Sequence, residues 1–468
     1  MHPSSLWGNY SIGSFGKEAY DFVDFLYECG FSVWQTLPFC MTDEFNSPYK
    51  SPAAFSYNPY FIDLEELFKK GYITKRELEN AKSDSVFLCE YEKLRKERMP
   101  LLFKAAERAL ANPFLREKTD AFISDNPRLA KAARFLSLGD KCGMPSSFRG
   151  EVMEMETLWR FLFFEFFSEW QNLKEYANQK GIEIIGDIPI YVSYESADVW
   201  EFPELFLLDK DGLCSEVAGV PPDYFSAEGQ LWGNPIYNYE KMKDDGFLWW
   251  RERIKHTLSL FDGARIDHFR GLDAYWSIPS DKSAACGSWK KGPGRELLRA
   301  ICDEAGKKLL IAEDLGDIDD SVRGLRDEFS LPGMRVFEFA FLGDEKSPHL
   351  PHNYINNSVA YTATHDNNTL LGYLFECESW MRKKIFEYSG YTGENIDEGG
   401  RAVIRTLFSS SAGVVILPMQ DVLGFGADTR MNIPGKSENN WAWRVTGEQI
   451  KRVDRERYRR LLSLYGRI

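Results

Sequence analysis

Short apolar runs that end in acidic residues recur in the second half of the chain. They lie at residues 263–271 (GARIDHFRG), 308–316 (KLLIAEDLG) and 359–367 (VAYTATHDN). A short, continuous apolar run bounded by turn residues is typical of a strand that is buried in a parallel sheet. The pattern therefore predicts three parallel strands, each with an acidic residue at its carboxyl end.

Four more stretches have the same apolar character. The predicted strands start at Phe31, Glu183, Gly263, Leu309, Met334, Ser358 and Ala412. Apolar residues also recur at helical spacing outside these stretches, as at Phe22, Phe25 and Leu26 before the first one. This alternation predicts an α/β fold, a (β/α)8 TIM barrel with helical and loop insertions between its strands.

One long segment without strand-end acids interrupts the alternation. Residues 65–179 are rich in Lys, Glu, Leu and Ala with helical periodicity. We expect them to form a mainly helical insertion subdomain, whereas residues 1–64 and 180–468 form the catalytic barrel. Aromatic residues of the last helix are expected to pack against the barrel wall: Trp159, Phe161, Phe163, Phe164, Phe166 and Phe167.

The acids at the strand ends, Asp267, Glu313 and Asp366, are candidates for chemistry. The strands of a barrel carry their active-site residues at one face, so the three acids are expected to meet in one pocket. Side chains alternate along a strand, so Arg265 and Asp267 face the same side. The arginine would favour the ionised carboxylate that a nucleophile requires. The alternative is a structural Arg–Asp pair with two unrelated acids, which the convergence of three strands disfavours.

These stretches resemble the amylomaltase family, the 4-α-glucanotransferases of glycoside hydrolase family 77. The resemblance also covers residues 46–49, 186–192, 217–226, 229–235, 419–424 and 430–435. It implies an enzyme that moves α-1,4-glucan segments from a donor to the 4-hydroxyl of an acceptor glucan or glucose. The transfer would retain the anomeric configuration through a covalent glycosyl-enzyme, with α-1,4-glucans and maltooligosaccharides as partners and no cofactor or metal.

The resemblance also implies a role for each acid. Asp267 would be the nucleophile, Glu313 the acid and then the base, and Asp366 a stabiliser that binds sugar hydroxyls. Arg265 would keep Asp267 ionised. Four more residues are implied in the substrate pocket: Tyr49, Asp187, His365 and Asn432. His268 is a weaker candidate, because strand alternation aims it away unless the strand ends before it.

The stretch from residue 220 to residue 238 is rich in Pro and aromatic residues and is expected to be a long loop. Long loops of this kind usually bind or cover something. Tyr224, Phe225 and Trp232 are candidates for stacking on sugar rings, and Asp223 for binding a hydroxyl. The alternative is a structural Ω-loop.

The sequence departs from the family pattern at three places. In family members a short apolar run that forms the first barrel strand precedes the segment resembling residues 1–16, and here it is largely missing. We therefore expect a truncated first strand, and hypothesise that Met1 is an internal methionine of a longer reading frame. Asn368 stands where the family often has an acid, and Glu338 where many members carry glutamine, which is expected to alter acceptor binding.

The composition limits which binding partners and which cellular compartment are expected. The 468 residues include 71 acidic and 57 basic residues, a net charge of −14, which weighs against nucleic-acid and anionic-membrane partners. The eight cysteines have no paired spacing, so reduced thiols in a cytoplasmic protein are expected. No apolar run approaches the length of a membrane span. The oligomeric state is left open.

Three other functions stay in consideration. A plain α-1,4-glucan hydrolase would use the same two carboxylates with water as the acceptor. A catalytically idle α-glucan-binding protein is disfavoured because all three acids are present. A metal-dependent barrel enzyme is disfavoured because the strand-end histidines lie in no cluster with the spacing of metal ligands.

Overall fold

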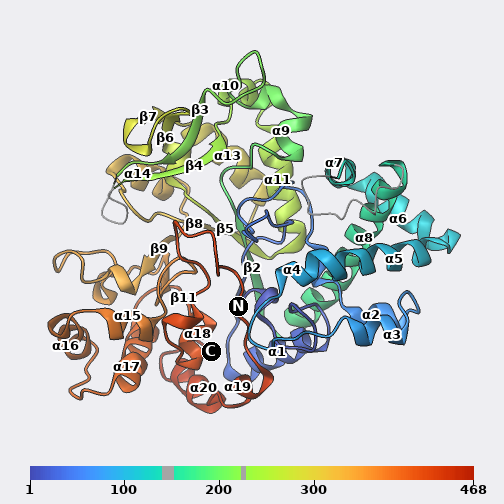
Figure 1. Ribbon diagram of the computed structural model, residues 1–468. Coiled ribbons are helices and arrows are strands. Elements are labelled where there is room, and N and C mark those ends of the chain that lie inside the picture. The colour runs from blue at the N-terminus through green and yellow to red at the C-terminus, as the bar shows by residue number, and fades with distance from the viewer. Residues whose placement is uncertain (140–151, 223–227) are drawn as a thin grey trace.

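The computed structural model describes residues 1–139, 152–222 and 228–468 (Figure 1). Seven parallel strands form one sheet in the order β1-β2-β5-β8-β9-β10-β11. They are β1 (Val33–Gln35), β2 (Glu183–Ile188), β5 (Gly263–Ile266), β8 (Leu309–Ala312), β9 (Gly333–Val336), β10 (Ser358–Tyr361) and β11 (Val414–Ile416). All seven predicted strands are present, with starts within two residues of those expected.

The sheet curls into a nearly closed barrel. Among the described residues β1 and β11 do not pair with each other. The chain start lies beside β1, where the Met1 amine donates to the Gln35 carbonyl oxygen at 3.3 Å and Trp34 Nε1 donates to the Met1 carbonyl oxygen at 2.6 Å. The arrangement confirms the TIM-barrel prediction, while a strand before Met1 stays a prediction.

Helices surround this sheet (Figure 1). The barrel helices and the short helices near them are α1 (Lys17–Cys29), α9 (Ala197–Glu201), α10 (Tyr239–Lys243), α11 (Leu248–Leu260), α12 (Arg270–Asp273), α13 (Gly294–Ala305), α14 (Asp320–Glu328), α15 (Leu370–Glu376), α16 (Ser379–Tyr388), α17 (Ile396–Ser409), α18 (Met419–Leu423), α19 (Gly447–Lys451) and α20 (Arg455–Leu464). Local signals set their ends. Thr369 caps α15 by accepting a hydrogen bond from the Gly372 N–H at 3.0 Å, and α1 stops at Gly30, whose φ of 82° suits glycine.

The segment between β1 and β2 is helical, at the right of Figure 1. It contains α2 (Leu64–Lys69), α3 (Lys75–Asn80), α4 (Tyr91–Lys93), α5 (Met99–Leu110), α6 (Pro113–Asp125), α7 (Pro127–Ser137) and α8 (Val152–Gln179). The rings of Trp170 on α8 and Phe39 lie 4.7 Å apart, and Trp170 Nε1 donates to the Leu260 carbonyl oxygen at 2.8 Å. Helix α8 therefore packs against the barrel, and its residues share one apolar core with it. Separate domains with boundaries at residues 64 and 179 stay a prediction.

A second, antiparallel sheet has the strand order β4-β3-β6-β7. Its strands are β3 (Glu216–Val220), β4 (Gln230–Pro235), β6 (Ala274–Pro279) and β7 (Ser288–Lys291). The prediction of one continuous loop from residue 220 to residue 238 is therefore wrong, because residues 230–235 form a strand. The sequence there lacks alternation, and pairing of β3 with both β4 and the distant β6 decides the structure.

Two more observations, on the cysteines and on membrane-spanning helices, apply to the described residues only. Their seven cysteines are free thiols. Within the described ranges, no helix combines the length and the apolar character that crossing a membrane requires.

Candidate active site

Arg265 is the centre of the candidate site. The parallel register places it on β5 beside Asp187 of β2. Its Nη1 atom donates to both carboxylate oxygens of Asp187, at 2.8 and 2.7 Å, and its Nη2 atom donates to Asp267 Oδ1 at 2.8 Å. Burial lowers the pKa of Arg265, but Asp187 and Asp267 outweigh burial and raise it well above its ordinary value. The guanidinium therefore stays charged and joins two carboxylates.

Glu313 lies directly beside this group. The register pairs Ile266 with Ala312, so the next residues on the two strands, Asp267 and Glu313, stand at neighbouring strand ends. Glu313 Oε2 accepts from the His268 N–H at 2.6 Å, and Oε1 accepts from the Leu315 N–H at 3.1 Å. Burial raises the pKa of Glu313 to about 8, with a further rise from Asp267 and an opposing effect of Arg265. The carboxyl is therefore largely protonated at neutral pH.

Asp366 is presented by the loop that follows β10. Its side chain is 45% exposed, and its Oδ1 atom accepts from Asn432 Nδ2 at 2.6 Å. His365 Nε2 lies 3.4 Å from Asp366 Oδ2. Arg430 Nη2 donates to the Asp366 carbonyl oxygen at 3.1 Å, and the Asn432 N–H donates to the His365 carbonyl oxygen at 3.1 Å. The segment at residues 430–432 thus fixes this loop.

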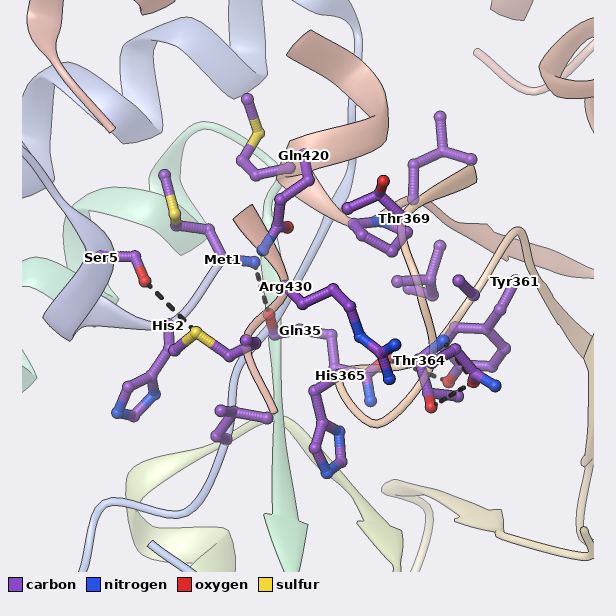
Figure 2. A pocket seen from close by; sticks show the side chains of 18 of the residues that line it. Met1, His2, Ser5, Gln35, Tyr361, Thr364, His365, Thr369, Gln420 and Arg430 are labelled. Atoms are coloured by element: carbon purple, nitrogen blue, oxygen red, sulfur yellow. Dashed lines mark hydrogen bonds between the residues drawn. The ribbon is translucent and has the colours of Figure 1, made fainter. Parts of the chain in front are cut away.

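A cavity of about 110 Å³ borders the same loop. Figure 2 shows His365 and Thr364 at its edge, with the Arg430 side chain reaching toward them. Met1 and Gln35 line another part of the wall.

Aromatic rings join three distant parts of the chain at this site. Tyr49 follows β1, and its hydroxyl donates to Asp187 Oδ2 at 2.7 Å. Its ring stacks on His365 with centroids 5.0 Å apart and an interplanar angle of 11°. Trp441 lies 5.8 Å from both rings. The contacts bring Tyr49 and His365 to the Arg265 group.

His268 also lies at the site, because β5 ends at Ile266. His268 has a φ of 47°, which turns the chain out of the strand direction, so the alternation argument against it does not apply. Its ring meets Trp232 of β4 edge to face, with centroids 4.9 Å apart. Burial lowers the pKa of His268 to about 4, so the ring is neutral. Its Nε2 atom is buried and has no hydrogen-bond partner within the described part of the chain.

Some predicted residues cannot be placed, and some contacts were not predicted. Asp223, Tyr224 and Phe225 lie outside the described residues. Arg430 and Trp441 were missed as site residues. Arg430 lies within a stretch that carries the family resemblance, so it could have been proposed, whereas no pattern around Trp441 points to it.

The arrangement suits acid-assisted substitution at an acetal carbon. A protonated carboxyl and a carboxylate held by a guanidinium stand at adjacent strand ends, and a third, exposed carboxylate lies on the β10 loop. Environments that set two carboxyl groups to different protonation states are typical of glycoside chemistry. Among the described residues, no group of three or more His, Cys, Asp or Glu side chains is placed to hold a metal ion.

Comparison with known proteins agrees with this chemistry. The profile of a family described as 4-alpha-glucanotransferase matches residues 1–450. A 4-alpha-glucanotransferase of Aquifex aeolicus is 42% identical, over 100% of this chain and 98% of its own. One from Clostridium butyricum is 41% identical over all of both chains.

Two solved structures also match the chain. An amylomaltase from Streptococcus agalactiae, solved in complex with acarbose, superposes with a TM-score of 0.94 at 36% identity, covering 100% of this chain and 98% of its own. Amylomaltase from Corynebacterium glutamicum shares the fold, with a TM-score of 0.81 at 16% identity over 99% of this chain and 74% of its own.

Proposed function

Because the chain belongs to the 4-α-glucanotransferase family, glycoside hydrolase family 77, and is a 4-α-glucanotransferase, we propose that Asp267, Glu313 and Asp366 carry out the transfer. The matching family and relatives are described as 4-alpha-glucanotransferases or amylomaltases, which favours transfer over plain hydrolysis and over binding without turnover. The substrates proposed are α-1,4-glucans and maltooligosaccharides, which are neutral and suit a chain of net charge −14.

In the first step Asp267 attacks the anomeric carbon of the donor. The bond from that carbon to the glycosidic oxygen breaks, and Glu313 gives its proton to the departing oxygen. The leaving glucan thus departs with a free 4-hydroxyl, and the donor segment stays on Asp267 as an ester. Arg265 supports this step, because its hydrogen bond stabilises the carboxylate form of Asp267 before attack.

In the second step the acceptor replaces the departed chain. The ionised Glu313 takes the proton of the acceptor 4-hydroxyl, whose oxygen attacks the anomeric carbon and releases Asp267. Two inversions give net retention. A pKa of about 8 suits Glu313 to both duties, since the group must hold a proton in one step and accept it in the next.

Asp366 is proposed to bind hydroxyls of the donor sugar next to the reacting bond. Its partial exposure and its contacts with Asn432 and His365 support this role. Contacts of this kind accelerate the reaction when they strengthen as positive charge develops on the sugar. Tyr49, Asp187, His268 and Trp232 are proposed to complete the pocket. Tyr224 and Phe225 are kept as candidates for stacking on sugar rings and Asp223 as a hydroxyl partner, on the composition of their stretch of sequence.

A cytoplasmic location completes the proposal. The seven free cysteines of the described residues support it, because disulfides are rare in reducing compartments.

The observation that carries the proposal is the Arg265 bridge between Asp187 and Asp267, with Glu313 at the neighbouring strand end. The test is incubation of purified protein with maltotriose beside Asp267→Asn, with products separated by chromatography. We expect glucose and a ladder of longer and shorter oligosaccharides, no net gain in reducing ends, and no ladder with the variant. A ladder from Asp267→Asn at the wild-type rate would refute the nucleophile, and rising reducing ends would indicate hydrolysis.

A further inference from the structure

Two buried carboxyl groups lie behind the loop that presents Asp366, and the steps proposed above do not use them. One is Glu338, in the short 3-10 helix Phe337–Phe339 after β9, and the other is Asp421 on α18. Both are almost fully buried, with 7% and 5% of their surface exposed. Buried carboxyl groups are rare without a specific reason.

Asp421 holds both ends of the loop. Its Oδ2 atom accepts from the Thr362 hydroxyl at 2.5 Å, where β10 has just ended. Its Oδ1 atom accepts from the Leu370 N–H at 2.7 Å, in the first turn of α15. Asp366 lies midway between these two anchors, so the position of Asp421 sets the span of the loop that carries it.

Glu338 lies against the same loop at two other points. Its N–H donates to the Thr362 carbonyl oxygen at 3.3 Å. Its carboxyl faces the backbone N–H of Asn368, two residues after Asp366. The Asn368 side chain packs so closely on Gly372 that a Cβ atom there would meet Asn368 Oδ1 at 2.2 Å. Asn368 therefore has little freedom to move unless Glu338 or α15 moves with it.

Glu338 and Asn368 each carry one unsatisfied side-chain atom. Glu338 Oε1 and Asn368 Nδ2 are both buried without a hydrogen-bond partner among the residues that the structure describes. One is a potential acceptor and the other a donor, so the two groups are chemically complementary. These are also the two positions beyond the chain start at which the sequence departs from the family pattern, and the fold brings them together.

We propose that Glu338 is a positioning residue for glucan transfer, which together with Asp421 holds the β10 loop and so fixes where Asp366 meets the donor sugar. This inference rests on the role proposed above for Asp366. Figure 2 shows the neighbouring part of this support, where Thr369, Gln420 and Arg430 gather around the loop.

The surroundings of Glu338 favour its neutral, protonated form. Burial raises its pKa well above the ordinary value, and Asp421 from α18 and Glu376 from α15 raise it further. Arg430 and the Asn368 backbone N–H oppose this rise. Burial also raises the pKa of Asp421, to about 6, against the effect of its bonds from Thr362 and Leu370. The surroundings of both groups therefore oppose a second negative charge behind the loop.

Ionisation of Glu338 would place a second negative charge beside Asp421 and push the loop supports apart. The expected sign is a loss of activity as the pH rises through the pKa of Glu338. With a natural donor this loss cannot be told apart from the loss of the Glu313 acid, because Glu313 must be protonated for the leaving glucan to depart. A maltotriosyl fluoride donor removes that requirement, since fluoride leaves without a proton from an acid.

The first test compares Glu338→Gln and Glu338→Leu at pH 7 with maltotriose. Glutamine keeps the shape and the neutral charge, so kcat should stay close to the wild-type value. Leucine removes the contact with the loop, and kcat should fall on the order of 10- to 100-fold, as expected for a displaced catalytic group. KM should stay nearly unchanged, because the lost contacts act mainly in the transition state. Glu387→Gln, an exposed site on α16, is the matched control.

The second test measures fluoride release from maltotriosyl fluoride against pH, with glucose as acceptor. The wild type and Glu387→Gln should lose activity at alkaline pH, and Glu338→Gln should keep it over the same range. An identical alkaline loss in Glu338→Gln, or full kcat in Glu338→Leu, overturns the inference. If Glu338→Leu does not fold, the pH comparison decides alone.

Asp366→Asn is measured in parallel to separate the two proposals. Near-complete activity of Asp366→Asn refutes the role proposed for Asp366. An inactive Asp366→Asn together with a fully active Glu338→Leu refutes the positioning role alone.

Discussion

Replacing Arg265 with lysine separates the charge of this residue from its geometry. The guanidinium donates three hydrogen bonds to two carboxylates, at 2.7 to 2.8 Å, and its side chain is 6% exposed. A lysine ammonium keeps the positive charge but is a point donor that cannot match this fork. We therefore expect Arg265→Lys to keep its pairing with Asp187 and to lose the bond to Asp267.

The size of the effect follows from the bond that is lost. A hydrogen bond between charged groups contributes roughly 1.5–3 kcal/mol. If the whole contribution acts on the nucleophile, kcat/KM should fall by about 10- to 160-fold, since about 1.36 kcal/mol corresponds to a factor of ten. The thermal midpoint should fall as well, because Asp187 is almost fully buried and its pairing becomes weaker.

The assay is maltotriose disproportionation across a range of substrate concentrations, together with thermal unfolding of the same samples. Arg295→Lys is a suitable control, because Arg295 also uses two of its nitrogens in ion pairing, both with Glu328 at 2.5 and 2.6 Å, but is exposed. That variant should match the wild type in both measurements. Wild-type kcat/KM in Arg265→Lys would refute the reasoning, because the fork geometry would then have no part in the reaction.

Three other outcomes are expected. Tyr49→Phe removes the 2.7 Å bond to Asp187 but keeps the ring on His365, so kcat/KM should fall by less than in Arg265→Lys, and a larger fall would contradict this. With maltotriose, wild-type activity should decline as the pH rises through about 8, the pKa of Glu313, because above it Glu313 has lost the proton that the leaving oxygen needs. A rate that stays flat to higher pH argues against Glu313 as the acid. Trp170→Ala should lower unfolding free energy by roughly 3–5 kcal/mol in chemical denaturation, because it empties a fully buried site between α8 and the barrel; a small change would place α8 outside the core.

The order of the barrel strands and the acids at their ends were readable from the sequence. A buried parallel strand is a local feature, because both of its faces require apolar residues and its end requires a turn. Asp267 and Glu313 follow such strands directly, and Asp366 lies on the loop after the next one, so a place at one face of the barrel followed from the strand pattern and the fold class. The family resemblance added roles that no local pattern contains.

Tertiary structure decided what depends on contacts between distant segments. Strand β4 forms because it pairs with β3 through backbone hydrogen bonds, and no alternation of apolar and polar residues at 230–235 predicts it. The turn at His268 depends on where β5 stops, and the contact of the Trp441 ring with Tyr49 joins parts of the chain almost 400 residues apart. Glu338 and Asn368 were visible only as separate departures from a pattern. Their proximity arises because folding removes both groups from water and leaves each the other's neighbour.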